Sequence, residues 1–468
     1  MDENVDFVIT FRTLIIFLLK LVYNKTMEDI KAIVKNVVKD GFEFEIYLSK
    51  SNKVKIDIED KVVDRIEASN EQGLGIRVIK DGKMGFSYTT KLTKKDIENC
   101  TKMAMDIALS QDKEDVFELL KEQKENKNSI ELFDKEGLSK AKEEKIKKLI
   151  DMEDKIKAYD PRISLVRDLS YTESIYSYVM ENSYGVKVEE TLSGFFVMGC
   201  AIAKDSQDTS SGCSYMASRF LEDINFDLIS KDIAINTISL LNPKSFETRS
   251  LPVVFSPDSM VSLLRAFSSI FLGDSLIKNK TMLKDKLQEQ IASEDITIID
   301  DGTINRAIGS SCFDADGNPT QKNVVVENGI FKTFLHNIYT AKKSNQEPTS
   351  NSVRAGYKSI PQTGVHNFYL APKEHSLDTL LGAYEECVYI TELMGLHMAD
   401  PISGNFSLGA SGIFYKNAKP MYPIRAVTVA SNFLELLKKV KLVGNDFRFF
   451  GHVGSPSVLV ENITIGGV

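Results

Sequence analysis

The fold of the C-terminal half is decided by residues 388–432, which read VYITELMGLHMADPISGNFSLGASGIFYKNAKPMYPIRAVTVASN. Apolar residues alternate with polar ones over short runs, as in strands with one buried face. Glycines interrupt these runs at Gly395, Gly404, Gly409 and Gly412, at intervals that suit tight turns and not helices. The stretch predicts a compact β core or, in a second interpretation, a sheet edge or groove that accepts an extended peptide by strand addition.

The candidate contact residues of such a groove are Gly404, Gly409, Ser411 and Gly412. Small side chains gather in the segment SLGASG, where a core strand normally carries β-branched or aromatic residues. Glycine at position 412 has two possible reasons, a close approach of another backbone or a positive φ angle. In the groove interpretation these residues line the surface that meets a peptide or a partner protein.

The overall composition is that of an ordinary globular protein. The chain has 468 residues, of which 43% are hydrophobic and 26% charged, enough for two or three domains with their own cores. Its formal net charge is −8, whereas a general nucleic-acid surface needs clustered cations that neutralise phosphates. We therefore expect no nucleic-acid partner.

The cysteine pattern predicts neither a disulfide framework nor a thiolate metal site. The five cysteines are scattered, odd in number and without a CxxC pair: Cys100, Cys200, Cys213, Cys312 and Cys387. Such usage fits a reducing cytoplasm.

The N-terminal residues 1–26 stand apart from the rest of the chain. Residues 7–23, FVITFRTLIIFLLKLVY, are mostly apolar but short and interrupted by Arg12 and Lys20, which argues against a membrane span. Neither a signal peptide nor its cleavage site is recognisable. An over-extended start is favoured over a membrane-surface anchor, and a membrane partner is expected only if residues 7–23 are present and exposed.

Residues 27–245 predict an α+β domain. A helix from Met27 and the strands FEFEIYLSK and KVKIDIED precede a hairpin whose turn is Asp81-Gly82. Thr93 then begins a helix to about residue 110, which we expect to bury four apolar side chains: Ile97, Met103, Ala104 and Ile107. Residues 111–157 form a charged segment, and residues 138–160 within it have helical spacing.

Residues 246–468 predict a second, more β-rich domain. It includes a helix with Ser256 as its N-cap, followed by Pro257 and Asp258. Because helices and strands come in separate runs, the fold class expected is α+β with two domains.

Several motifs, in order, resemble the signature of the TldD/PmbA family of two-subunit metalloproteases. They are IDDGT at 299–303, DADGNPTQKNVVVENGIFKTFLHNIYTAKK at 314–343, TELMG at 391–395, SGNFSLGASGIFYKN at 403–417, YPI and VTVASN at 422–432, and VGND at 443–446. The resemblance extends more weakly back to about Met27. It implies a two-domain TldD/PmbA-like architecture and a cytoplasmic complex that degrades or processes peptides.

The zinc motif of the catalytic members is missing from this chain. Those members carry HExxxH on the helix before a Gly-Asp, whereas here LLRAFSSIFL precedes Gly273-Asp274. No two of the five histidines are three or four residues apart, and no cysteine follows VGND. His452 lies after that motif, but a single histidine is more often a surface or hydrogen-bonded residue than a ligand.

The resemblance therefore implies a non-catalytic, PmbA/TldE-type subunit with no catalytic or metal-binding residue of its own. Zinc is expected in a TldD-like partner subunit, and extended or unfolded peptides are the expected substrates. Two alternatives remain open, a homodimer that binds peptides without hydrolysing them and an independent hydrolase with an unrecognised nucleophile. The GASG turn at 409–412 does not match GxSxG, and no helix follows it.

Overall fold

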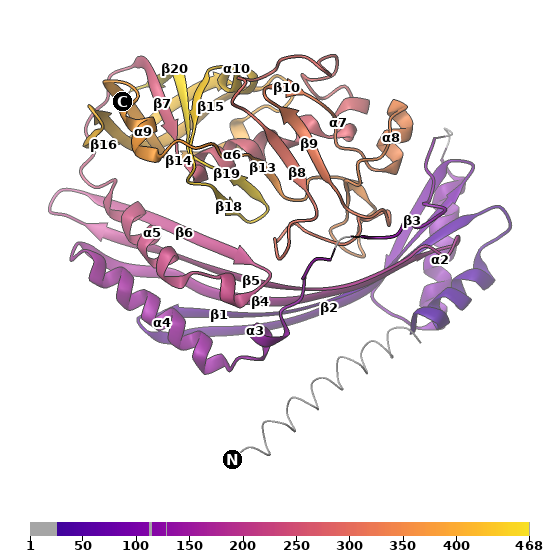
Figure 1. Cartoon of the computed structure of the whole chain (residues 1–468). Coiled ribbons are helices and arrows are strands. Elements are labelled where there is room, and N and C mark those ends of the chain that lie inside the picture. Colours follow the sequence, from indigo (N-terminus) through magenta and orange to yellow (C-terminus); the bar gives the residue numbers. More distant parts are fainter. Residues whose placement is uncertain (1–25, 112–114, 128, 468) are drawn as a thin grey trace.

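The computed structural model describes residues 26–111, 115–127 and 129–467. The apolar stretch 7–23 lies outside the described residues, as does all of the expected extension except Thr26. Among the helices that are described, none is long and apolar enough to cross a membrane. The architecture is the expected α+β fold, with a long curved sheet below and a β-rich half above it (Figure 1).

The first half of the chain forms one antiparallel sheet in the order β3-β2-β1-β4-β5-β6. Its strands are β1 (Glu43–Glu59), β2 (Val62–Lys80), β3 (Lys83–Thr89), β4 (Ile163–Asn182), β5 (Lys187–Lys204) and β6 (Thr209–Ser218). The two strands expected before the hairpin are fused into the single strand β1. The polar run from Lys50 to Lys53 interrupts the apolar alternation, but these residues pair with β2 and the strand continues in phase from Phe44 to Ile58.

The hairpin between β2 and β3 is confirmed. Asp81 and Gly82 have φ angles of 50° and 74°, the left-handed pair that a two-residue turn between twisted strands requires. The register then runs from Lys80 opposite Lys83 to Leu74 opposite Thr89.

Helices cover one face of this sheet at both ends. Residues 26–37 are helical and pack with α2 (Lys94–Leu109) over one end, whereas α4 (Lys142–Tyr159) and α5 (Phe226–Ile238) pack over the other. Short helical segments α3 (Lys135–Ser139) and η1 (Leu221–Asp223) lie between them in sequence. The helical spacing in the charged segment is thus confirmed by α4.

The inward face predicted for α2 is partly wrong. Thr93 is the N-cap as expected, but Met103 and Ile107 are 58% and 39% exposed. The helix instead lies on β3 through small residues, since a Cβ at Gly85 would be only 1.8 Å from the carbonyl oxygen of Ala104. The contact with β3 therefore centres on the small residue Ala104; Ile97 and Met105 are also buried, whereas Met103 and Ile107 point outward.

The second half of the chain contains a closed set of strands. The order β16-β15-β14-β7-β20-β17, with a further pairing of β16 with β20, joins five strands into a ring. These strands are β7 (Arg249–Phe255), β14 (Glu386–Met394), β15 (Asn405–Lys416), β16 (Lys419–Asn432), β17 (Val440–Val443) and β20 (Val458–Gly466).

A second sheet in this half has the order β10-β9-β8-β13-β19-β18. Its strands are β8 (Ile298–Asp301), β9 (Lys322–Glu327), β10 (Ile330–Phe331), β13 (Phe368–Leu370), β18 (Arg448–Phe450) and β19 (Val453–Ser455), and a small pair is formed by β11 (Ser352–Val353) and β12 (Gln362–Thr363). The helical segments are α6 (Pro257–Phe267), η2 (Ser268–Phe271), α7 (Gly273–Ile277), α8 (Ile338–Ser344), α9 (Leu377–Gly382), η3 (Leu396–Met398) and α10 (Phe433–Lys438). Ser256 caps α6 as expected, accepting a hydrogen bond from the Ser259 amide at 3.2 Å.

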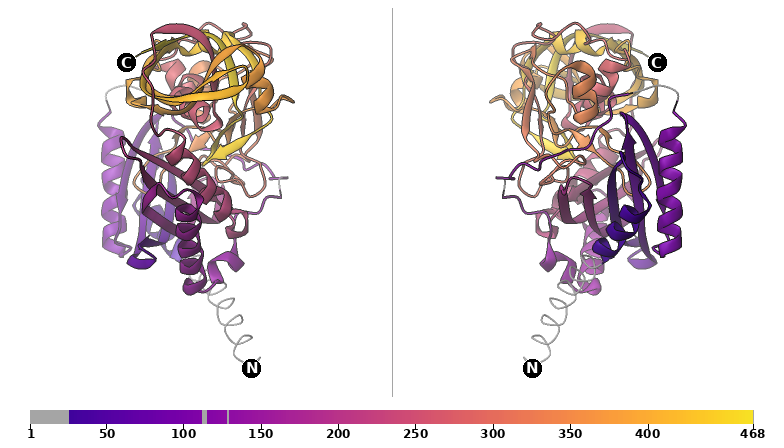
Figure 2. Two further views of the ribbon diagram at one scale, coloured as in Figure 1. Left: turned by 90° about the vertical axis from the view of Figure 1, so that its left-hand side faces the viewer. Right: turned by 90° about the vertical axis from the view of Figure 1, so that its right-hand side faces the viewer.

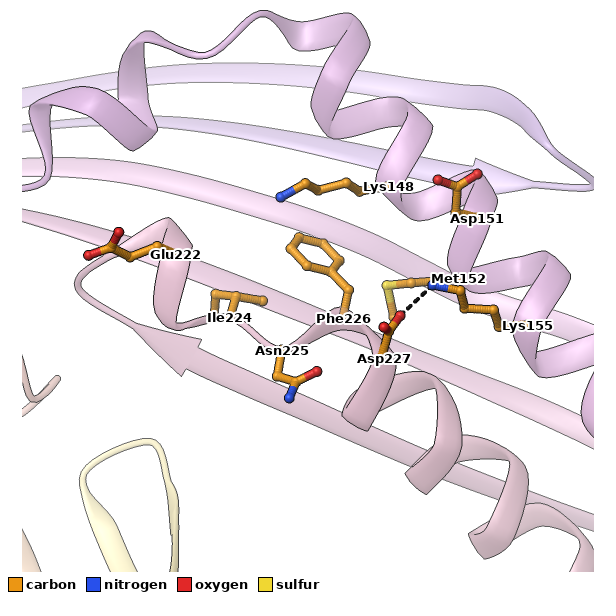
Figure 3. Close-up of a pocket in the computed structure, with 9 residues that line it drawn as sticks. All are labelled: Lys148, Asp151, Met152, Lys155, Glu222, Ile224, Asn225, Phe226 and Asp227. Carbon is orange, nitrogen blue, oxygen red and sulfur yellow. Dashed lines mark hydrogen bonds and ion pairs between the residues drawn. The ribbon is translucent and has the colours of Figure 1, made fainter.

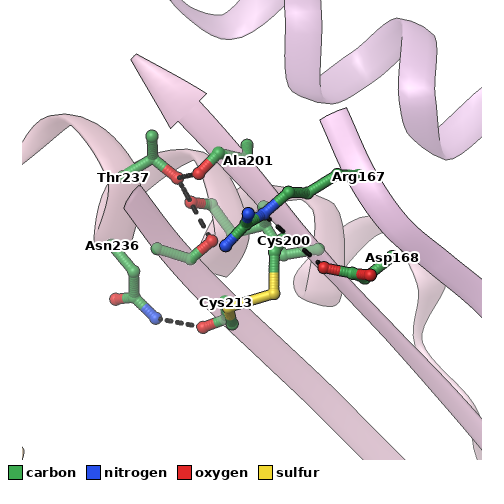
Figure 4. The surroundings of a disulfide bond; sticks show 9 residues. Arg167, Asp168, Cys200, Ala201, Cys213, Asn236 and Thr237 are labelled. Carbon is green, nitrogen blue, oxygen red and sulfur yellow. Dashed lines mark hydrogen bonds and ion pairs between the residues drawn. A yellow bond between two sulfur atoms is a disulfide. The ribbon is translucent and has the colours of Figure 1, made fainter. Parts of the chain in front are cut away.

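One disulfide corrects the cysteine prediction. Cys200 on β5 and Cys213 on β6 are bonded, with Cα atoms 4.1 Å apart (Figure 4). Cys100, Cys312 and Cys387 are free. The two bonded residues lie directly opposite each other in the strand register. The two cysteines are 13 residues apart in the sequence. Their pairing can be recognised only from the register of β5 and β6, which the sequence pattern does not give.

The two halves of the molecule lie against each other (Figure 2), and buried charged groups join them. Glu45 on β1 pairs with Arg77 on β2 and with Arg354 from the second half, and Arg77 also reaches Asp316 at 3.5 Å. The Arg354 guanidinium lies over the Tyr47 ring, 4.4 Å from its centroid. Burial raises the pKa of Glu45, but the two guanidiniums outweigh it and hold that pKa below its usual value. We call these four charged residues the interdomain cluster.

Candidate functional site

The glycine-rich segment lies on β15 and the turn before it, and its two outer glycines meet different surroundings. Gly404 has a φ of +80°, and a Cβ there would lie 2.4 Å from the Met282 side chain. Gly409 is half-buried, and a Cβ there would make ordinary contacts with Met394 at 3.6 Å. Gly404 is thus required for local structure, whereas the surroundings of Gly409 leave room for a Cβ atom.

Gly412 is glycine because another backbone approaches it closely. A Cβ at this position would lie 2.1 Å from the carbonyl oxygen of Tyr389 on β14. The φ angle of Gly412 is not among the positive ones. A β-bulge between Ile390 and Glu392 brings the two strands together here. Of the two reasons considered from the sequence, the close approach applies.

Ser411 is buried beneath a carboxylate. Its residue is 3% exposed, it lies opposite Glu392 in the register, and its hydroxyl hydrogen-bonds the Glu392 side chain. Desolvation raises the pKa of Glu392, the neighbouring Asp258 raises it further, and the Ser411 hydroxyl partly opposes the shift. Burial likewise raises the pKa of Asp258, against the attraction of Arg265 and Arg448.

Exposed apolar side chains follow this carboxylate in the chain. Met394, Met398 and Ile402 are 40%, 63% and 51% exposed, and Met394 lies next to Gly409. We call these three residues the methionine rim. Glu392 and the methionine rim lie within the stretch 388–432, but the sequence pattern singles out neither. They are recognised only from the strand register, which places Glu392 over Ser411.

The helix that precedes Gly273-Asp274 turns apolar side chains into the core. Four side chains of α6 are fully buried in the core, namely Met260, Leu263, Leu264 and Phe267. Arg265, on the same helix, donates to the Phe450 carbonyl at 3.0 Å. These groups offer no neutral or anionic ligand for zinc. Across residues 26–111, 115–127 and 129–467, no three His, Cys, Asp or Glu residues are grouped so that they could bind a metal.

The histidines have structural surroundings. His336 is buried with its Nδ1 atom 3.2 Å from the Thr340 hydroxyl, and burial lowers its pKa to about 4. His366 is buried as well, with Nε2 2.9 Å from the Ser350 carbonyl. His452 is exposed on the turn between β18 and β19. With a pKa of about 4, His336 is neutral near pH 7, and its buried, locally hydrogen-bonded imidazole has a structural role.

Two cavities lie among the helices of the first half, and the sequence did not point to either. The larger, about 420 Å³, opens between α4 and α5 (Figure 3); its lining residues are Lys148, Asp151, Met152, Lys155, Glu222, Ile224, Asn225, Phe226 and Asp227. The Lys155 ammonium is paired with Asp227, and Lys148 lies over the Phe226 ring. The charges of this cavity are mixed and largely paired, so it has no preference for ligands of one sign.

Comparison with known proteins covers nearly the whole described chain. Three family models match: PmbA/TldA metallopeptidase domain 1 at residues 44–108, the central domain at 135–241 and the C-terminal domain at 248–467. The first two divide the long sheet between them, because β1 to β3 and β4 to β6 pair side by side through β1 and β4.

Relatives align over almost their full length. An uncharacterized protein of Methanocaldococcus jannaschii is 34% identical over 436 residues, covering 92% of this chain and 99% of the relative. The metalloprotease PmbA of Escherichia coli is 25% identical over 426 residues, covering 90% and 92%. A crystal structure from Thermotoga maritima, described as a candidate modulator of a DNA gyrase, has a TM-score of 0.84 at 30% identity and covers 95% of this chain and 100% of that one. The chain thus belongs to the PmbA/TldD metallopeptidase family.

Proposed function

We propose that this chain is the non-catalytic, PmbA/TldE-like subunit of a metalloprotease complex that degrades or processes extended peptides. The zinc ion would be held by a TldD-like partner subunit, and the complex would work in the cytoplasm. A reducing compartment would oppose the Cys200–Cys213 disulfide.

The observation that carries the proposal is the apolar, buried character of α6. The chain belongs to a family of metallopeptidases, yet its helix before Gly273-Asp274 places Leu263, Leu264 and Phe267 in the core, where they have no exposed surface. A water-activating zinc site needs three protein ligands around an open position. Replacing core leucines by ligands would require a different packing of this helix, so the chain supports a binding role better than a hydrolytic one.

We further propose that a peptide or the partner subunit docks on the face formed by Gly404, Gly409, Ser411 and Gly412. Because Ser411 and Gly412 are buried, contact on this face would be made by Gly409, the Glu392 carboxylate and the methionine rim. Methionine side chains adapt to partners of varied shape, and an exposed apolar cluster is typical of an interaction surface.

The subunit assignment is tested by zinc content and by reconstitution. We expect the purified chain to contain far less than one zinc per molecule and to leave an unfolded peptide substrate intact. Affinity purification from the native host, followed by mass spectrometry, should recover a homologue that carries HExxxH, and mixing the two chains should produce peptide hydrolysis. About one zinc per chain that is lost on mutating His452 would contradict the assignment.

The docking face is tested by Met398→Glu, because Met398 is exposed and its replacement leaves the core untouched. We expect normal stability with loss of partner-dependent proteolysis. Met421→Glu is the matched control, since Met421 is 53% exposed on β16 outside the rim. If both variants support proteolysis as well as the parent chain does, this face does not take part in docking. Hydrolysis by this chain alone would favour an independent hydrolase, and peptide binding without any partner would favour the homodimeric binding protein.

A further inference from the structure

A long part of β2 has no strand on its outer side. β1 pairs with β2 from Val62 to Ile79, whereas β3 pairs only with Leu74 to Lys80. Residues 62–72 therefore form a free edge of the long sheet (Figure 1). Within the part of the chain that the structure describes, no other hydrogen bond engages a backbone group of these residues.

This edge is open to solvent on both faces. All residues from 64 to 72 are exposed, including Ile66 at 48%, and Val62 is 66% exposed. Free edges present unpaired N–H and C=O groups, which favour pairing with another strand, and native proteins usually protect them with proline, bulges or short length. Residues 62–72 contain no proline, and the register shift in their pairing with β1 lies at Asp64, near one end, so that Arg65 to Gln72 pair without a bulge.

The edge sequence VVDRIEASNEQ is complementary to itself in one antiparallel register. A two-fold axis at Ile66 places Ile66 opposite its own copy and Arg65 opposite Glu67 on both sides of the axis. Directly opposed apolar residues and opposite charges stabilise antiparallel pairs, and a two-fold interface uses the same patch twice. Arg65 and Glu67 are exposed and lie 3.0 Å apart in one chain, and Arg65 also pairs with Asp57 on β1 at 3.3 Å. Across the axis, Arg65 would exchange its Glu67 partner for the same residue of the second copy.

We propose that residues 62–72 pair antiparallel with the same residues of a second copy of this chain. The pairing joins two six-stranded sheets into one continuous sheet of two copies. The charges favour a second copy of this chain as the pairing strand, because an unrelated strand would not present the order Arg65, Ile66, Glu67 in reverse. This surface is separate from the docking face on β15, and the inference does not depend on the proposed function.

Charge reversal tests the register on the full-length chain. Sedimentation velocity over a concentration series should show a monomer–dimer equilibrium for the parent chain. In Arg65→Glu, two pairs of like charges face each other, and we expect the dissociation constant to rise about tenfold or more. The double variant Arg65→Glu with Glu67→Arg restores opposite charges, and its dissociation constant should return close to that of the parent.

Cysteine cross-linking tests the position of the axis independently of charge. Opposed residues have Cβ atoms about 4.5–5.5 Å apart, so Ile66→Cys should form a disulfide-linked dimer under mild oxidation. Val62→Cys is the matched control, more exposed than position 66 but opposite Asn70 in this register and roughly 27 Å from its own copy. The melting temperature of each variant is measured first. Because the substituted positions are exposed, we expect melting temperatures near that of the parent chain.

Three results would overturn the inference. They are a parent chain that stays monomeric throughout the concentration series, a dimer that Arg65→Glu leaves unchanged, and a dimeric Ile66→Cys sample that does not cross-link. A dimer that cross-links equally at position 62 would also place the axis elsewhere.

Discussion

Gly409 and Gly412 are three residues apart on β15, yet they differ in what a side chain would meet. A Cβ at Gly412 would lie 2.1 Å from the Tyr389 carbonyl oxygen, and one at Gly409 no closer than 3.6 Å to any neighbour. We expect Gly412→Ala to cost about 1–3 kcal/mol by overpacking and Gly409→Ala to leave stability nearly unchanged. Chemical denaturation of the two variants checks this, and an equal loss in both would contradict the structure.

His336 predicts a pH dependence of stability. Burial lowers its pKa from 6.5 to about 4, so between these values the unfolded chain binds a proton that the folded chain does not. Its contribution to stability is therefore complete above pH 6.5, falls as the pH drops toward 4, and amounts to about 3 kcal/mol over that range.

We expect the loss of stability between pH 7.5 and pH 5 to be smaller in His336→Asn than in the parent chain, by about 2 kcal/mol. The exposed His397 provides the control, because His397→Asn should follow the parent. Urea unfolding at the two pH values measures the difference, and parallel losses in all three proteins would refute a neutral buried His336.

At the scale of single elements, the disulfide between β5 and β6 is open to direct counting. The denatured, unreduced chain should expose three reactive thiols and the reduced chain all five cysteines. In Cys213→Ser the unreduced count should rise to four, because Cys200 is released, whereas Cys312→Ser should lower it to two. Loss of the cross-link should also cost about 3 kcal/mol of stability. Five reactive thiols without reduction would show that the bond is absent.

The elements also show how far the sequence leads. The Asp81-Gly82 turn and the Ser256 cap were predictable because each depends on local chemistry. The outward face of α2 was not, because the close contact of Gly85 with Ala104 depends on tertiary packing. For the same reason the motif located the candidate site on β15, but only the register showed that Ser411 lies beneath Glu392.

At the scale of the whole molecule, the interdomain cluster should hold the two halves together. We expect Arg354→Met to cost about 3–5 kcal/mol, since it removes one partner of the buried Glu45 and the stacking on Tyr47. The control is Lys358→Met, which breaks an exposed pair with Glu71 between the same two halves and should leave the stability close to that of the parent chain. Denaturant unfolding that is equal for both variants would contradict this role.

The closed strand ring has a consequence for synthesis of the chain. Strand β7 ends at Phe255, and its two neighbours are β14 and β20, the latter ending at Gly466. At about 5–20 residues per second, a ribosome completes β20 roughly 10–40 s after β7. The apolar strand Arg249–Phe255 lacks both neighbours until β14 is complete at Met394 and still lacks one until β20 is complete, while every strand of the first sheet is already available. Molecules caught at this stage are the ones that a chaperone would be expected to bind.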